Sequence, residues 1–294
     1  MLQKESISRK IFNLINFIFL TFLSLACLLP FLHVLFSSVS DPILLARNSG
    51  LVLWPMGFTT MGYKLVAMNP SIVNGLRNTV FYATAGTFIN IMMTSMGAYV
   101  CSQKKFIPRN VIMFIITFSM FFSGGLIPYY LLIRSLNMTN TIWALLIPSA
   151  ISAYNLILMR TAFNEIPDSL EESARIDGAG DFSILFRIII PVSKPVMAVM
   201  VLLYAVGHWN SWFPALIFLR DRTLFPLQLV LREILIEQNV SRIMVVANSG
   251  DQTNLYKPLI RYSSIIVSIV PIICFYPFIQ KYFIRGIMIG SIKG

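Results

Sequence analysis

Long apolar runs separated by shorter polar segments are the main pattern of this sequence. Six runs reach the 18 or more residues that a helix needs to cross a ~30 Å hydrocarbon core at about 1.5 Å per residue. Lipid offers backbone groups no hydrogen-bond partners, so each run is expected to be a helix. None shows the polar–apolar alternation of a transmembrane β-barrel. The predicted spans are 13–36, 78–100, 110–133, 142–163, 196–219 and 262–283.

The composition also indicates a membrane protein. Of the 294 residues, 56% are hydrophobic and 12% are charged, whereas about 25% of the residues of a soluble domain are charged. The net charge of +11 does not indicate a nucleic-acid partner, because the basic residues lie scattered beside the apolar runs, as membrane anchors do. We predict an all-α, polytopic membrane protein in which residues 1–294 form one domain.

The basic residues set the predicted orientation. Six spans place both termini on one side, and Lys104, Lys105 and Arg109 crowd the short segment 101–109. Basic residues in short segments favour the cytoplasmic side. We therefore expect both termini and the loop 164–195 in the cytoplasm. The loops expected outside are 37–77, 134–141 and 220–261.

The loop 164–195 is more polar than the runs beside it, and its first half has the signals of a short helix. Ser169 and Glu172 have capping-box spacing, as do Asp168 and Glu171. Gly178 supplies a C-terminal stop. Ser173 and Ala174, on the same helix, are small enough to let another backbone approach closely.

A second short helix is predicted after this glycine, with Asp181 as its cap and Pro191 at its end. Its apolar residues follow helical spacing. Such a face must be covered outside the membrane, either by this chain's own helices or by a cytosolic partner, and the pattern alone does not decide between them. The face consists of Phe182, Leu185, Phe186 and Ile189.

These residues resemble a known motif. Glu172-Ser173-Ala174, Gly178 and Ile188 to Pro191 match the spacing of the EAA motif of ABC importer permeases, with Ser173 in place of Ala and Ile190 in place of Leu. The flanking sequences FSGGLIPYYLLIRSLNMTNTIWALLIP and GHWNSWFPALIFL look like the carbohydrate-importer branch. Within it, the chain is most similar to the LplC/YtcP-type subgroup, which includes alginate-importer permeases.

The resemblance implies a MetI-like permease fold with six transmembrane helices and a cytoplasmic two-helix coupling loop that docks into a separate ATPase. The chain has no G-x-x-x-x-G-K-[ST] phosphate loop. ATP and Mg²⁺ are therefore expected on the ATPase, and this chain is expected to be neither an enzyme nor the holder of a cofactor or metal. The residues that the motif assigns to coupling are Glu172, Ser173, Ala174, Gly178, Phe182, Leu185, Phe186, Ile188 and Pro191.

The resemblance also implies partners and a location. It implies a second, homologous permease, two ATPase subunits and an extracytoplasmic solute-binding protein, assembled in the cytoplasmic membrane of a prokaryote. The loop 220–261 has helical apolar spacing from Leu227 to Leu235. It would either lie on the membrane surface or meet the binding protein, with 248–254 reaching into it.

The predicted spans contain neutral polar and aromatic residues but no Asp or Glu. Ion-coupled carriers usually need ionisable groups within the membrane, so this absence disfavours the alternative function, a secondary carrier of polar solutes. Aromatic faces and amides suit a sugar path, although an interfacial Trp belt and helix packing would also use them. The candidate path residues are Tyr154, Asn155, His208, Trp209, Asn210 and Trp212.

Three smaller features complete the expectations. Gly207 and Pro214 are expected to bend the fifth span, and Gly124, Gly125 and Pro128 predict a kink with tight packing in the third. Asn78 and Thr79 open the second span, where they are expected to act as caps. The basic outer face is compatible with acidic oligosaccharides such as uronates, because arginine attracts carboxylates.

Overall fold

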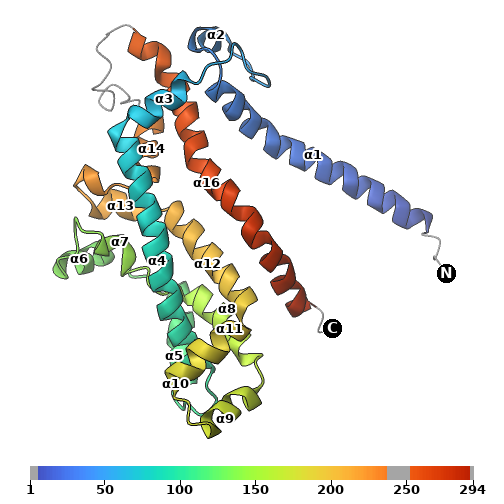
Figure 1. Cartoon of the computed structure of the whole chain (residues 1–294), viewed down its shortest axis with the longest axis vertical. Helices are drawn as coiled ribbons and strands as arrows, with labels where there is room; N and C mark the ends of the chain where they lie inside the picture. Colours follow the sequence, from blue (N-terminus) through green and yellow to red (C-terminus); the bar gives the residue numbers. More distant parts are fainter. Residues whose placement is uncertain (1–5, 237–251, 292–294) are drawn as a thin grey trace. The chain divides into compact units, whose positions relative to one another are not determined.

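The computed structural model describes residues 6–236 and 252–291. Within these ranges the chain is helical, with one isolated β-bridge between Ser40 and Phe58 and no strand. Figure 1 shows the elements in chain order. Their bounds are α1 (Ile7–Ser38), α2 (Pro42–Arg47), α3 (Met61–Met68), α4 (Pro70–Ser102), α5 (Arg109–Phe121), α6 (Leu126–Ser135), α7 (Trp143–Leu146), α8 (Ala153–Asn164), α9 (Asp168–Ile176), α10 (Asp181–Ile184), η1 (Leu185–Ile189), α11 (Ile190–Val192), α12 (Lys194–Trp209), α13 (Phe213–Phe218), η2 (Arg222–Leu224), α14 (Leu227–Ile236) and α16 (Gln252–Ser291).

The chain divides into two compact units. The first comprises residues 1–70 and 233–269, and the second comprises residues 71–232 and 270–294. The coupling motif and the candidate path residues all belong to the second unit. The assignment of residues 1–294 to one permease domain stays a prediction.

In the first unit, the loop after α1 folds back onto the end of that helix. The backbone N–H of Val52 donates to Nδ1 of His33 over 3.0 Å, and the N–H of Met56 donates to the Ser40 hydroxyl over 3.0 Å. The hydroxyls of Ser38 and Tyr63 lie 2.7 Å apart, which ties α3 to the end of α1. These bonds give the segment 37–63 a defined shape although it contains only short helices.

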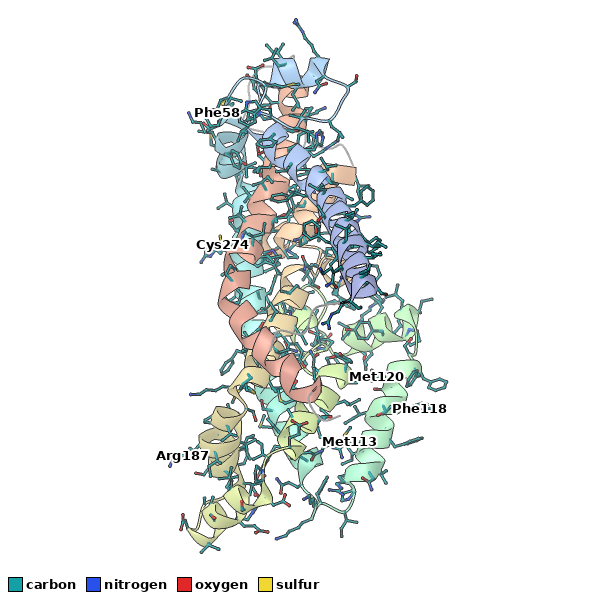
Figure 2. All side chains as sticks on the ribbon, turned by 90° about the vertical axis from the view of Figure 1, so that its right-hand side faces the viewer. Phe58, Met113, Phe118, Met120, Arg187 and Cys274 are labelled. Atoms are coloured by element: carbon teal, nitrogen blue, oxygen red, sulfur yellow. The ribbon has the colours of Figure 1, made fainter. Side chains whose placement is uncertain are left out.

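The second unit is built along α4 (Figure 1). Near the C-terminal end of α4, a core cluster combines Ala98 and Tyr99 with residues of α8, α10, η1 and α12. Two smaller clusters join α6, α7 and α13, and α13 and α14. The helix α5, by contrast, buries none of its residues. Figure 2 labels Met113, Phe118 and Met120 on it, and this apolar surface is available to lipid or to another subunit.

Three of the six predicted spans are broken rather than continuous. The run 110–133 divides at 122–125 into α5 and α6, which differ in direction by 118°. The run 142–163 divides at 147–152, and the run 196–219 divides at 210–212. The expectation of one helix per run is therefore wrong for these three. The first break contains Gly125 with φ +83°, a left-handed conformation that other residues rarely adopt, and the second contains Pro148.

The number of spans is not fixed by helix length and composition. Among the described residues, two helices are long and apolar enough to cross a membrane, α1 and residues Tyr256–Phe275 of α16. Two bent pairs, α5 with α6 and residues 181–192 with α12, would raise this number to four. The helix α4 is 33 residues long, but it carries buried polar side chains such as Thr79, Asn90 and Thr94, which make it less apolar. Six spans therefore stay a prediction.

Candidate coupling loop and polar seam

The first helix of the candidate coupling loop ends as its glycine predicts. Gly178 has φ +81°, and its N–H donates to the carbonyl of Arg175 over 3.1 Å. The N–H of Ala179 donates to the carbonyl of Ala174 over 2.9 Å. This pair of bonds is a Schellman motif, which ends a helix sharply and favours glycine at the left-handed position. The predicted stop at Gly178 is confirmed.

The predicted side-chain caps of the two loop helices are wrong. The first helix begins after Pro167 with no side-chain cap. Asp168 instead forms an ion pair with Lys104, and the Glu171 carboxylate accepts hydrogen bonds from Gln103 over 3.0 and 3.2 Å. These acids are therefore used to tie α9 to the segment that follows α4. Local spacing could not reveal partners more than 60 residues away.

Asp181 was expected to cap the second loop helix, but its carboxylate pairs with Arg175 instead. Its Oδ1 lies 2.6 Å from Nη2 of Arg175, and the residue before it, Gly180, is the N-cap of α10 without a side-chain bond. This hydrogen bond raises the pKa of the Arg175 guanidinium above its ordinary value. The ion pair joins the end of α9 to the start of α10 across the glycine turn.

The second loop helix has the predicted extent but contains a π-helical turn that was not predicted. The segments α10, η1 and α11 follow one another without a break from Asp181 to Val192. Pro191 lies in the last turn of this helix, one residue before its end at Val192, and the chain then bends by 90° into α12, so the predicted end at Pro191 is confirmed. The π turn at 185–189 adds a residue to one turn, and such turns are frequent at functional sites.

This helix divides its apolar face between the chain's own core and the solvent. Leu185 is 2% exposed, and with Ile184 and Ile189 it belongs to the core cluster of α4, α8 and α12. Phe182, by contrast, is 71% exposed, and Phe186 is exposed as well. Packing within the chain therefore accounts for half of the face only. The residues that the structure describes leave the other half exposed.

The first loop helix, α9, also ends in an exposed apolar residue. Ile176, the last residue of that helix, is 87% exposed, and the side chain of Arg187 projects from the second helix in Figure 2. Ala174 is buried in the core cluster and anchors α9 inside the chain. The expectation that Ala174 leaves room for the backbone of a partner is therefore wrong. Of the predicted coupling residues, those exposed are Glu172, Ser173, Gly178, Phe182, Phe186 and Pro191; Ile188 is half-buried, and Ala174 and Leu185 are buried.

The candidate path residues lie at and around two of the helix breaks. The helix α12 ends at Trp209 and α13 begins at Phe213, so the break is at Asn210–Trp212. The break lies between the two residues that were expected to bend this span: Gly207 is inside α12, and Pro214 occupies the first turn of α13. Asn210 is exposed. Trp212 is partly exposed and carries the Arg232 guanidinium 5.1 Å from its ring centroid, a cation–π contact.

The other candidate path residues divide into exposed and buried groups. Tyr154, in the first turn of α8, is 60% exposed, whereas Asn155 beside it is buried. Trp209 is buried too. His208 is mostly enclosed and hydrogen-bonded. Tyr154, Asn210 and Trp212 are therefore the exposed residues of the set, whereas Asn155, His208 and Trp209 are partly or fully buried.

His208 belongs to a set of contacts that we call the polar seam. Its Nε2 lies 2.6 Å from Oδ1 of Asn90. A carbonyl oxygen only accepts, so this nitrogen carries the proton. Asn90 in turn donates to the backbone carbonyl of Ser149. The seam consists of Gly86, Asn90 and Thr94 of α4, Ser149 and Ser152 of the α7–α8 break, and Tyr204 and His208 of α12.

The seam has a second hydrogen-bonded group one turn away. The hydroxyls of Thr94 and Tyr204 lie 2.7 Å apart, and the N–H of Ser152 donates to the Tyr204 hydroxyl over 3.3 Å. Gly86 makes room for the first group, because a Cβ there would come within 2.5 Å of the His208 ring. The seam thus joins three segments by neutral hydrogen bonds, in a region where an unsatisfied polar group would be costly.

Sequence reasoning found only His208 of this seam. The signal was present, because Gly86, Asn90 and Thr94 recur at intervals of four residues, as do Tyr204 and His208, and side chains four apart share one helix face. Asn78 and Thr79 were also misjudged, since both lie inside α4. Asn78 donates to the carbonyls of Thr223 and Phe225, and Thr79 accepts from the N–H of Leu227 over 2.7 Å.

Comparisons with known proteins agree with this architecture. The family model described as "Binding-protein-dependent transport system inner membrane component" matches residues 86–289, more than half of the chain. The protein LplC of Bacillus subtilis (strain 168) is 37% identical over 288 residues, covering 97% of this chain and 96% of LplC. The "Polygalacturonan/rhamnogalacturonan transport system permease protein YtcP" of the same organism is 36% identical over 289 residues, covering 97% and 99%.

A solved structure matches as well. It is a chain of a bacterial ABC transporter involved in the import of the acidic polysaccharide alginate, with a TM-score of 0.86 and 31% identity over 95% of this chain and 99% of that one. The chain therefore belongs to the family of inner membrane components of binding-protein-dependent transport systems, the permeases of ABC importers.

Proposed function

We propose that this chain is the permease subunit of an ATP-driven importer of oligosaccharides. The observation that carries the proposal is the divided second helix of the coupling loop. Its inner half is fixed in the core cluster with α4 and α12, while Phe182 and Phe186 are exposed. A surface that is rigidly joined to the membrane helices but uncovered at its tip is suited to transmit the movement of a docked ATPase.

The partners follow from this mechanism and from the family. A binding protein would deliver the sugar on one side, and two ATPase subunits, which bind ATP and Mg²⁺, would dock on the other, with a second permease completing the path. The coupling loop would then be cytoplasmic, as would both termini if the chain crosses the membrane six times. Family membership favours this function over a secondary carrier.

Two observations support oligosaccharides as the substrate: the descriptions of the relatives, and the side chains that lie beside the helix breaks. YtcP is described as a polygalacturonan/rhamnogalacturonan permease, and the matching structure comes from an alginate importer. In this chain, Tyr154, Asn210 and Trp212 expose an aromatic or amide group next to the breaks in α7–α8 and α12–α13. Discontinuous helices commonly form transporter binding sites, and sugars bind to aromatic faces and amides. We assign these three residues to the path and Asn155, His208 and Trp209 to its support.

The proposal is tested by replacing the glycine that orients the two loop helices. Gly178→Leu places a side chain at φ +81°, which costs about 1–2 kcal/mol. Gly180→Leu is the matched control, because Gly180 is also exposed and uncrowded but has an ordinary φ of −77°. Each variant is expressed with its endogenous partners, solubilised and purified by a tag on this chain. Co-purifying ATPase and sugar uptake are then measured.

We expect wild type and Gly180→Leu to retain an ATPase subunit and uptake. Gly178→Leu should insert at a normal level but lose the ATPase, or retain it without uptake. Absence of an ATPase from all three preparations would contradict the importer assignment. Normal uptake by Gly178→Leu would instead contradict the role of the coupling loop.

A further inference from the structure

A small polar cavity, open at the surface, is lined by residues near the N-terminal end of α4, and four of its five lining residues are exposed. Figure 1 shows this end of α4 opposite the coupling loop. The cavity has a volume of about 340 Å³, and it is lined by Asn74, Arg77, Asn78, Phe81 and Thr223. Volumes from about 300 Å³ upward are typical of small-molecule sites. The first four residues fall on one face of α4, since their positions follow helical spacing, and Thr223 comes from η2. None of these residues belongs to the coupling loop or to the candidate path.

The wall opposite the helix is held in place by hydrogen bonds. Asn78 Nδ2 donates to the carbonyls of Thr223 and Phe225, over 2.7 and 3.0 Å, and Tyr82 donates to the carbonyl of Leu224 over 2.8 Å. The N–H of Thr223 donates to the Asp221 carboxylate over 2.9 Å, which lowers the pKa of that carboxyl. The cavity is therefore preformed, and binding would not require the η2 segment to be ordered first.

The groups that line the cavity leave hydrogen-bonding capacity unused. Within residues 6–236 and 252–291, the side chains of Asn74 and Arg77 have no hydrogen bond or ion pair. Asn78 uses its N–H groups on the η2 segment, which leaves its Oδ1 as an acceptor. Phe81 is 44% exposed and offers an apolar ring. The cavity thus combines a planar cation, amide donors and acceptors, a hydroxyl and an aromatic face.

We propose that this cavity binds the carboxylate-bearing sugar unit of an acidic oligosaccharide. A guanidinium holds a carboxylate through two parallel hydrogen bonds. The ring of Phe81 would pack on the C–H face of the pyranose, and Asn74, Asn78 and Thr223 would bond its hydroxyls. A lipid phosphate would also pair with Arg77, but it would leave the aromatic face and the amide acceptor without a use. The chemistry therefore favours a uronate.

The site rests on the proposed function, which puts this end of α4 on the side where a binding protein delivers sugar. It would make contact with the substrate before the helix breaks do, and Arg77 would select for negative charge there. The relatives whose descriptions name acidic polysaccharides are consistent with such a substrate. Nothing in those descriptions assigns a contact to any residue of this region.

The test uses the complete importer, with binding protein, reconstituted in lipid vesicles. Uptake of trigalacturonate and of trimannuronate is measured for wild type, Arg77→Gln and Arg77→Lys. Arg134→Gln, which removes an exposed charge from the last turn of α6, is the matched control. Basal ATPase activity is measured in vesicles with and without anionic lipid, which distinguishes a lipid headgroup from a sugar carboxylate.

We expect wild type to import at least one of the acidic trimers and Arg77→Gln to import it about tenfold more slowly at low concentration, because a hydrogen-bonded ion pair is lost. Arg77→Lys should recover part of the rate, and Arg134→Gln should equal wild type. Unchanged uptake by Arg77→Gln would overturn the site, as would a wild-type importer that accepts neither trimer. A loss of basal ATPase activity in Arg77→Gln that occurs only with anionic lipid would assign the cavity to a headgroup and overturn it too. The Gly178→Leu co-purification is independent of the sugar, so it separates failure of this site from failure of the proposed function.

Discussion

The coupling loop and the polar seam, both in the second unit, are held together by opposite means. The loop is fixed by apolar side chains such as Leu185 and Ile189, and its charged pairs are exposed at its edge. The seam is fixed by neutral hydrogen bonds between His208, Asn90, Tyr204 and neighbouring groups, within the apolar body of the unit. The loop is therefore held mainly by apolar packing, and the seam is held mainly by hydrogen bonds.

This difference indicates where stability and function are located. In water, burial of apolar surface contributes most and an exposed ion pair contributes little. Among apolar helices, packing and hydrogen bonding hold neighbours together. We therefore expect damage to the seam to lower the stability of the helix bundle. Damage to the exposed side of the loop should instead leave the bundle intact and disconnect it from its partner.

The largest expected effect comes from filling the space beneath His208. Gly86→Leu would place a Cβ within 2.5 Å of the imidazole, which forces the ring away and leaves Asn90 Oδ1 without a donor. Overpacking and a lost buried hydrogen bond together cost about 3 kcal/mol. Thermal unfolding of the purified protein should show a clearly lower Tm. Gly207→Leu is the control, because a Cβ at Gly207 meets open space; an equal fall in both variants would show that the contact with His208 is unimportant.

An intermediate effect is expected from removing one hydroxyl of the seam. Tyr204→Phe loses the bonds to Thr94 and to the N–H of Ser152, which should cost about 1–2 kcal/mol. Thr94→Val and the double variant complete a thermodynamic cycle, in which the double variant should be less destabilised than the sum. Tyr154→Phe, on an exposed side chain, should leave Tm unchanged. Strict additivity in the cycle would contradict direct coupling of the two hydroxyls.

The smallest effect is expected at the edge of the loop. Lys104 and Asp168 form an ion pair in which both side chains are mostly exposed, and such pairs contribute about 0–1 kcal/mol. Lys104→Gln should change Tm little, and high salt should remove the difference from wild type. A large fall in Tm that persists at high salt would mean that α9 depends on this ion pair. It would contradict the claim that exposed charges contribute little to the stability of the loop.

Much of the loop could be predicted from sequence because its signals are local. The Schellman turn needs only Gly178 at the left-handed position, and the spacing of Phe182, Leu185 and Phe186 predicts a helix, although not its π turn at 185–189. The caps could not be predicted, because Asp168, Glu171 and Asp181 bond to Lys104, Gln103 and Arg175 instead. The sequence also could not predict which residues of the apolar face are buried and which are exposed, because this depends on the helices that pack against the face.

The broken spans and the seam were harder to predict for the same reason. A hydropathy pattern measures apolar length, so it did not separate α12 from α13 at Asn210–Trp212, where both sides are apolar. It also discounted the polar residues of α4, whose partners lie far away in sequence: Asn90 bonds Ser149 and His208, and Thr79 bonds Leu227. The structural role of these residues becomes visible only when the helices are packed together.

The central claim is that the exposed half of the second loop helix contacts an ATPase, and a photocrosslinker at Phe182 tests it most directly. The same crosslinker at Phe118, an exposed phenylalanine on α5 labelled in Figure 2, is the control. After illumination of the assembled complex in membranes, position 182 should give an adduct with an ATPase subunit and position 118 should not. Equal adducts from both positions, or adducts from position 182 only within this chain, would contradict the claim.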